Sequence, residues 1–244
     1  MSRPNRSEVI SPDETCIAHV ISRVVRRCFL LGDDPLTGKN YDHRKQWVEK
    51  LLEHQAKYFG IDLLCFSLMS NHIHQVLKSQ PEIVATWTSR EVAMRWLMLC
   101  PKRKQHDGSP AEPKETEINS IVNDAVKLKQ LRSRLSNISW WVRLMCQKLA
   151  IRANKEDELT GKFWEGRFRC IRILDEAGLL ACAAYVDLNP IRAALAQTLE
   201  ESDYTSAQRR IESLQSPDTH TEQRADRFLA PLTIDELQIG RAHV

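Results

Sequence analysis

No part of the sequence approaches the roughly 20 consecutive apolar residues that a membrane-spanning helix needs. Residues 1–14 carry charged side chains and no apolar run, so they do not resemble a secretory signal. We therefore expect a cytoplasmic protein with no membrane contact. The excess of positive charge is also small. The 35 Lys and Arg residues against 32 Asp and Glu residues give a net charge of +3, which does not by itself indicate nucleic-acid binding.

Cysteine pairs and several catalytic motifs are missing as well. The seven cysteines are odd in number and show no C-x-x-C spacing, which argues against a disulfide framework and a cysteine zinc site. Small buried thiols in a reducing compartment explain them better. There is no P-loop, G-x-G-x-x-G turn, nucleophile elbow or H-E-x-x-H helix. These absences disfavour a nucleotide-driven enzyme, a dehydrogenase, an esterase-type hydrolase and a zinc protease.

The composition is that of a globular protein, with 42% apolar and 27% charged residues. A length of 244 residues is long for one ordinary domain and short for two. We predict one domain at 15–196 with an insertion at about 81–158, after a leader at 1–14 and before a polar tail at 197–244. The last six residues (239–244), IGRAHV, are what a common sequencing adapter encodes, so we expect them to be an artefact.

The hydrophobic periodicity predicts an α+β fold. The predicted strands are 15–25, 61–69, 72–78 and 161–173, and the predicted helices are 41–59, 88–100, 118–135, 139–154, 175–188 and 191–196. The compact arrangement of these elements is a ferredoxin/RRM-like antiparallel sheet with helices packed on it, plus a mostly helical insertion.

His72 and His74 are separated by one residue in a predicted strand, directly after the turn Ser70–Asn71. Alternate side chains of a strand share a face, so both imidazoles point the same way. Such a pair suits two ligands of one divalent metal. The alternative, which is the more common one for an isolated H-x-H pair, is two solvated histidines at a hairpin edge.

Tyr185 lies inside a small, apolar helical segment, and Asn189 follows it by one helical turn. A phenol can form a covalent intermediate with phosphorus, although a core tyrosine with a hydrogen-bonded hydroxyl is the alternative. Because positions i and i+4 share a helix face, the Asn189 amide oxygen could approach whatever Tyr185 approaches. Asn before Pro is equally typical of a helix N-cap.

Two basic segments are candidates for DNA contacts. Arginines contact phosphates and aromatic rings stack on unpaired bases, whereas an ordinary edge strand with its aromatic residues inward is the alternative. The candidate residues are Arg23, Arg26, Arg27, Lys162, Trp164, Arg167, Arg169 and Arg172.

In combination, these segments resemble the HUH-type single-tyrosine transposases, and among them the REP-associated tyrosine transposases. The resemblance rests on LMSNHIHQVL (68–77), GKFWEGRFRCIRI (161–173) and YVDLNPIRAAL (185–195), with AHVISRVVRR (18–27) similar to the family's first strand. The sequence departs from the family in having Ser70 where Pro is usual, and in the length of residues 81–158.

The resemblance implies a DNA transposase that cleaves and rejoins single-stranded DNA, a form of DNA recombination. It implies that His72 and His74 bind Mg²⁺ or Mn²⁺, that Asn189 is a further ligand, and that Tyr185 is the nucleophile that forms a 5′-phosphotyrosine. The implied partner is single-stranded or hairpin DNA, and the protein would be a monomer or a homodimer.

Two other functions remain open from the sequence. One is a nicking or replication-initiation enzyme of the same chemistry. Such enzymes often have an appended helicase or a second tyrosine, whereas here the only neighbouring tyrosine is Tyr204 and no ATP-binding motif is present. The other is a catalytically idle module that binds hairpin DNA or RNA, with the histidines merely contacting phosphate.

Overall fold

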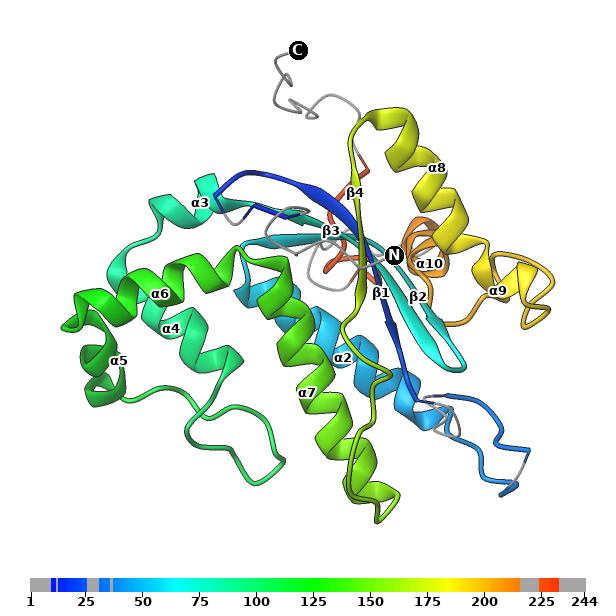
Figure 1. Ribbon diagram of the computed structural model, residues 1–244, viewed down its shortest axis with the longest axis horizontal. Helices are drawn as coiled ribbons and strands as arrows, with labels where there is room; N and C mark the ends of the chain where they lie inside the picture. The colour runs from blue at the N-terminus through cyan, green and yellow to red at the C-terminus, as the bar shows by residue number, and fades with distance from the viewer. Residues whose placement is uncertain (1–9, 12, 26–30, 36, 216–223, 233–244) are drawn as a thin grey trace.

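A single antiparallel sheet of four strands organises the part of the chain that the structure describes (Figure 1). The structure is a computed structural model, and it describes residues 10–11, 13–25, 31–35, 37–215 and 224–232. The strands are β1 (Ile17–Arg23), β2 (Ile61–Met69), β3 (His72–Ser79) and β4 (Arg169–Ile173), in the order β2-β3-β1-β4. Every neighbouring pair is antiparallel, which confirms the predicted type of sheet.

Helices cover both faces of this sheet. They are α2 (His43–Tyr58), α3 (Pro81–Thr86), α4 (Ser89–Leu99), α5 (Glu115–Val122), α6 (Ala125–Leu135), α7 (Ile138–Glu156), α8 (Glu176–Asp187), α9 (Asn189–Arg192) and α10 (Ser206–Gln215). Helices α2 and α7 pack on one face, and α8 packs on the other. Among the described residues, no helix is both long enough and apolar enough to cross a membrane.

The order β1-α2-β2-β3-α7-β4 is the strand and helix sequence of a ferredoxin-like fold, and it confirms the α+β prediction. Helices α3 to α6 are inserted between β3 and α7. Figure 1 shows them gathered at one end of the molecule, away from α8 and α9. The insertion is mostly helical, as predicted.

The two faces of the sheet are packed very differently. Along β3, Ile73 and Leu77 join the large apolar core under α2 and α7, whereas Val76 points to a much smaller core under α8. The large core also encloses Gln75, which accepts a 2.7 Å hydrogen bond from Trp141 Nε1 of α7. The face under α8 therefore carries the smaller apolar core.

Some predicted boundaries were wrong. The helix predicted over 118–135 is two helices, because Asp124 starts a new one by accepting a 2.9 Å hydrogen bond from the Lys127 backbone N–H. The helix predicted over 191–196 ends early, before Ala194, whose φ is 54°. Helices α3 and α10 were not predicted.

The predicted strand over 161–173 is regular only within β4. The cross-strand pairs that flank its irregular part are Trp164–Val24 and Arg169–Ile21. Residues 165–168 therefore stand opposite only two residues, 22 and 23. Two extra residues cannot fit a regular ladder, so this segment bulges out of the sheet just before β4.

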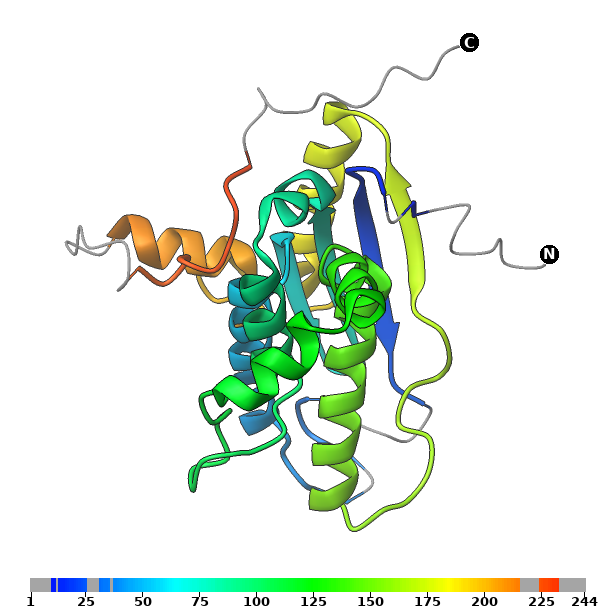
Figure 2. The same cartoon turned by 90° about the vertical axis from the view of Figure 1, so that its left-hand side faces the viewer.

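Helix α10 lies beside the edge strand β2, on the side of the sheet away from β4 (Figure 2). Asp187, at the end of α8, accepts hydrogen bonds from Ser206 Oγ at 2.5 Å and from the Ala207 backbone N–H at 3.2 Å. Burial raises the pKa of Asp187 in spite of these bonds. The start of α10 is thus stabilised by a residue of α8, which is distant in the sequence. No capping pattern is therefore visible in the sequence near Ser206, which explains why the sequence indicated only a polar tail after Gln197.

Replacing Asp187 with Asn should stabilise the protein at neutral pH. The pKa of this carboxyl is higher in the folded protein than in the unfolded chain. The folded protein therefore loses stability as the pH rises through the folded-state pKa and the buried carboxyl ionises. The amide keeps the acceptor oxygen without the buried charge. We expect Asp187→Asn to raise Tm by roughly 2–4 °C at pH 7, as about 1 kcal/mol does in a domain of this size.

Calorimetry at two pH values checks this expectation. At pH 3, below the ordinary pKa of an aspartate, the wild-type carboxyl is neutral in both states, so the two Tm values should converge. If Asp187→Asn has a lower Tm than the wild type at pH 7, the hydrogen bonds to the ionised carboxylate outweigh the cost of its burial.

Candidate active site

Two histidines of β3 share the sheet face under α8. His72 and His74 flank Ile73, which is fully buried in the large core on the opposite face. Their ring centroids lie 4.8 Å apart. The shared face predicted from the H-x-H spacing is therefore present.

A third histidine, which the sequence analysis missed, comes from β1. His19 Nε2 lies 2.9 Å from His74 Nδ1, and the two rings are stacked within 20° of parallel. Both side chains are buried. The sequence signal was weak because His19 is one polar residue in an apolar run. Only the register of β1 on β3, with Ile21 opposite His74, brings it to this face.

The contacts of the two β3 histidines indicate which ring nitrogens stay available. His72 Nδ1 lies 2.6 Å from Asn71 Oδ1. In this orientation of the amide, Nδ1 donates to the oxygen and Nε2 keeps a lone pair. His74 Nε2 is buried and has no hydrogen-bond partner among the described residues. An orphaned N–H costs more than an orphaned lone pair, which favours a His74 Nδ1–H that donates to His19.

Burial keeps all three imidazoles neutral. It lowers the pKa of His72 to about 4, with a further contribution from the charge of Arg23. It lowers the pKa of His74 to about 3, and the two neighbouring imidazoles add to that effect. The pKa of His19 is lowered by burial as well. At neutral pH the rings are thus in the form whose lone pairs bind metals.

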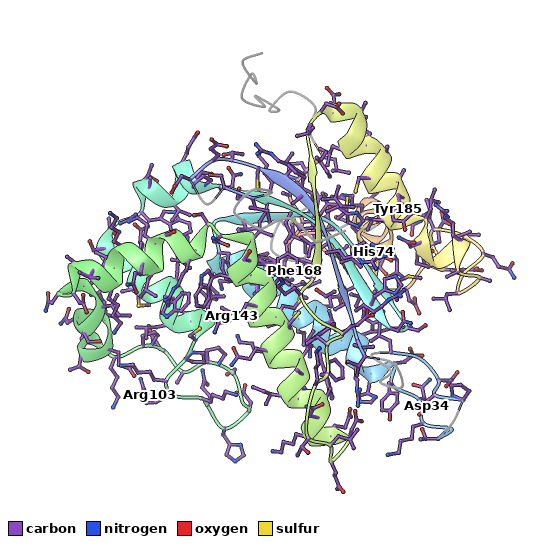
Figure 3. The ribbon with its side chains drawn as sticks, viewed as in Figure 1. Asp34, His74, Arg103, Arg143, Phe168 and Tyr185 are labelled. Carbon is purple, nitrogen blue, oxygen red and sulfur yellow. The ribbon has the colours of Figure 1, made fainter. Side chains whose placement is uncertain are left out.

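Tyr185 sits against this histidine cluster, on α8. Its ring meets His74 edge-on at 5.7 Å between centroids and His19 at 6.0 Å, and the side chain is 40% exposed (Figure 3). A phenol that is exposed and also in contact with two imidazoles is not the buried core tyrosine of the alternative interpretation. The arrangement presents a nucleophile next to a potential metal site.

The local sequence explains the position of α8. Asp175 caps the helix by accepting a 2.7 Å hydrogen bond from the Gly178 backbone N–H. Leu179, Ala183 and Val186 are spaced by about one turn and face the sheet, where they form the small core. Their spacing fixes the rotation of the helix and leaves Tyr185 at the border between the sheet and solvent.

Asn189 does not cap a helix. The N-cap of α9 is Leu188, and no side-chain capping hydrogen bond is present there. The Asn189 amide nitrogen is buried without a hydrogen-bond partner in the described part of the chain. Since the oxygen and nitrogen of an amide are assigned only from their partners, a flipped amide would place its oxygen at that position. The capping alternative is thus not observed, and the amide is left available as a ligand.

The available donors are two imidazole Nε2 atoms and one amide oxygen. Within the described residues, no group of three or more His, Cys, Asp and Glu side chains is arranged to hold a metal, so no carboxylate completes the set. Two neutral rings with free lone pairs and an orphaned buried amide nevertheless fit a divalent cation. Three protein ligands would leave coordination positions open, as a catalytic rather than a structural site requires.

Arginines surround the tyrosine and the histidines. Arg192 of α9, which was not predicted, places Cζ 5.3 Å from the centre of the Tyr185 ring. Arg23 stands opposite His72, and Arg169 stands opposite Ile21, so both side chains belong to the histidine face. Both are exposed. Two of the predicted DNA-contacting arginines are therefore brought to the candidate site.

The other predicted DNA contacts lie elsewhere. Trp164 and Arg167 line a cavity against α7, on the far face of the sheet. Arg172 also belongs to that face, and its guanidinium lies 3.8 Å from the carboxylate of Glu14. Lys162 is exposed in the segment before β4. Arg26 and Arg27 lie outside the described residues.

A comparison with solved structures gives a structural likeness. No family model and no curated protein matches the sequence. A solved structure of a REP-associated tyrosine transposase bound to a REP hairpin is similar to this chain, with a TM-score of 0.48 and 11% sequence identity. The similarity covers 100% of this chain and 99% of that one. What the site does must follow from its own residues.

Proposed function

We propose that this chain is a DNA transposase that cuts and rejoins single-stranded DNA through a 5′-phosphotyrosine on Tyr185, with a divalent cation as cofactor. The observation that carries this proposal is the edge-on contact of Tyr185 with His74, whose Nε2 is buried and unpartnered. Phosphoryl transfer depends mainly on positioning and on neutralising charge. A phenol placed beside a cation site supplies both.

His72, His74 and Asn189 would hold the cation. When bound, the cation would polarise the scissile phosphate and stabilise the departing oxygen. His19 accepts the hydrogen bond from His74 Nδ1 and so keeps His74 Nε2 directed away from β1. Imidazole nitrogen suits Mn²⁺ better than Mg²⁺, which prefers oxygen ligands.

Tyr185 Oη would attack the phosphorus in line. A new O–P bond forms while the bond from phosphorus to the 3′-oxygen breaks, the phenol gives up its proton, and the departing 3′-oxygen gains one. The products are a 5′-phosphotyrosine and a free 3′-hydroxyl. Because the phosphotyrosine is again an ester of phosphate, another 3′-hydroxyl can attack it and rejoin strands without ATP.

The three exposed arginines of this face, Arg23, Arg169 and Arg192, would contact the phosphates of the bound strand. An unpaired strand or a hairpin with an unpaired flank suits this open face, because no duplex has to be opened first.

A cleavage assay tests the proposal. The protein is incubated with a pool of hairpin and single-stranded oligonucleotides, and covalent protein–DNA complexes are resolved on a denaturing gel. We expect an adduct that mass spectrometry places on the Tyr185 peptide. It should form several-fold faster with Mn²⁺ than with Mg²⁺, and EDTA should abolish it.

Other outcomes separate the remaining functions. Tight, EDTA-resistant binding of hairpins without any adduct would replace the proposal with the idle binding module. An adduct on Tyr204 would support a two-tyrosine nicking enzyme. A fast reaction in EDTA would remove the role of the cation.

A further inference from the structure

The cavity against α7 lies on the face of the sheet opposite to Tyr185. Its volume is about 390 Å³, and it opens between the first half of α7 and the bulged segment before β4. Three aromatic residues line it: Trp140 of α7, Trp164 just before the bulged segment, and Phe168 within that segment. Figure 3 shows Phe168 beside β4 and Arg143 on α7. The cavity thus exists because two extra residues leave the ladder at this point.

The cavity is positively charged. Arg143 and Arg167 line it, and no Asp or Glu is among its lining residues. Arg143 lies over the ring of Trp140, 4.7 Å from its centre, and it has no carboxylate partner within the described part of the chain. An anionic ligand would therefore meet the Arg143 guanidinium without an acidic side chain in the cavity wall to compete for it.

The aromatic wall is held in place. Trp164 Nε1 donates a 2.7 Å hydrogen bond to the Cys146 carbonyl of α7, and Trp164 also pairs through its backbone with Val24. A ring fixed in this way loses little entropy when a flat ligand stacks in the cavity. Rigid aromatic rings beside arginines are the combination that binds unpaired bases.

The position of the cavity links it to the candidate site. Phe168 lines the cavity, whereas the next residue, Arg169, belongs to the histidine face. Strand β4 is the edge of the sheet, so nothing in the described sheet lies beyond it. A DNA strand that leaves Tyr185 across this edge meets Arg169 first and the cavity next.

We propose that this cavity binds an unpaired nucleobase in the flank of the DNA substrate, with the base among the rings of Trp164 and Phe168 and the adjoining phosphate on Arg143. The inference rests on the proposed function in taking DNA as the ligand. It adds a second contact point, which would let the protein distinguish a hairpin with a single-stranded flank from a blunt hairpin.

Equilibrium binding with 2-aminopurine, a fluorescent base, placed at successive flank positions tests the inference. In the wild type, one position should be quenched by stacking. In Phe168→Ala the quenching should be lost, and the Kd for the flanked hairpin should rise about tenfold, the size expected for one stacked base. Phe168→Tyr should restore both. The Kd for a blunt hairpin should not change in any variant.

Arg143→Gln should weaken binding of the flanked hairpin and reduce its dependence on salt. Arg152→Gln is the matched control, because Arg152 lies on the same helix but stacks on Trp47 instead. Unchanged quenching and affinity in Phe168→Ala and Arg143→Gln, with wild-type Tm values, would overturn the inference even if Tyr185 forms its adduct. Flank quenching without an adduct on Tyr185 would support the cavity and refute the proposed chemistry.

Discussion

Tyr185→Phe should bind hairpin DNA with the affinity of the wild type and form no covalent complex. The substitution removes one oxygen and keeps the ring that contacts His19 and His74, so the packing of α8 should not change. Without the phenolic oxygen there is no atom to form the bond to phosphorus. We expect the rate of strand cleavage to fall by roughly a thousandfold or more.

Tyr204→Phe is the matched control for this experiment. Tyr204 lies beside β2, where its carbonyl accepts a hydrogen bond from the Leu68 backbone N–H, and Lys45 lies 5.8 Å from its ring centre. It has no ring contact with the histidines of the described site. The control should cleave like the wild type. Full cleavage by Tyr185→Phe would eliminate Tyr185 as the nucleophile. If cleavage is instead lost only in Tyr204→Phe, Tyr204 is the nucleophile.

His74→Ala should abolish binding of Mn²⁺ at the site. His74 is the more buried of the two proposed imidazole ligands, and its Nε2 has no hydrogen-bond partner in the described residues. We expect the affinity for Mn²⁺, followed by electron paramagnetic resonance of the free ion, to fall by about a hundredfold or more. Cleavage should fall with it. His106→Ala, at an exposed position of the insertion, should bind Mn²⁺ like the wild type.

His19→Ala distinguishes a positioning role from a structural one. Because His19 only orients His74, its loss should weaken Mn²⁺ binding by roughly 10- to 100-fold, less than the loss of His74. His19→Gln keeps an acceptor and should recover part of that affinity. If His74→Ala and the wild type bind Mn²⁺ equally well, the proposed metal site is wrong. If His74→Ala loses Mn²⁺ affinity but His19→Ala binds Mn²⁺ like the wild type, the metal site stands and the positioning role of His19 is wrong.

Several features of the candidate site could be predicted because they depend on local rules. Strand alternation places His72 and His74 on one face wherever the strand is built. The capping carboxylate of Asp175 and the following apolar spacing define the helix that carries Tyr185. These rules involve neighbours a few residues apart, so they hold regardless of the rest of the fold.

The features that were missed depend on partners far apart in the chain. His19 reaches His74 only through the register of β1 on β3, and Arg192 reaches Tyr185 only because the chain continues into α9 after Leu188. Whether Asn189 caps a helix or acts as a ligand could not be decided locally, since Asn before Pro suits both roles. Burial, which neutralises the imidazoles, is a property of the assembled core.

The sequence by itself determined that this protein has an α+β fold with a β-hairpin carrying two histidines, followed much later by a helix carrying one tyrosine. Hydrophobic periodicity and turn chemistry encode such elements locally. Only the tertiary structure decided that the tyrosine meets the histidines, that the predicted DNA contacts divide between two faces, and that a bulge before β4 opens an aromatic cavity. Those outcomes follow from strand order and register, which depend on how the whole set of elements buries its apolar surface.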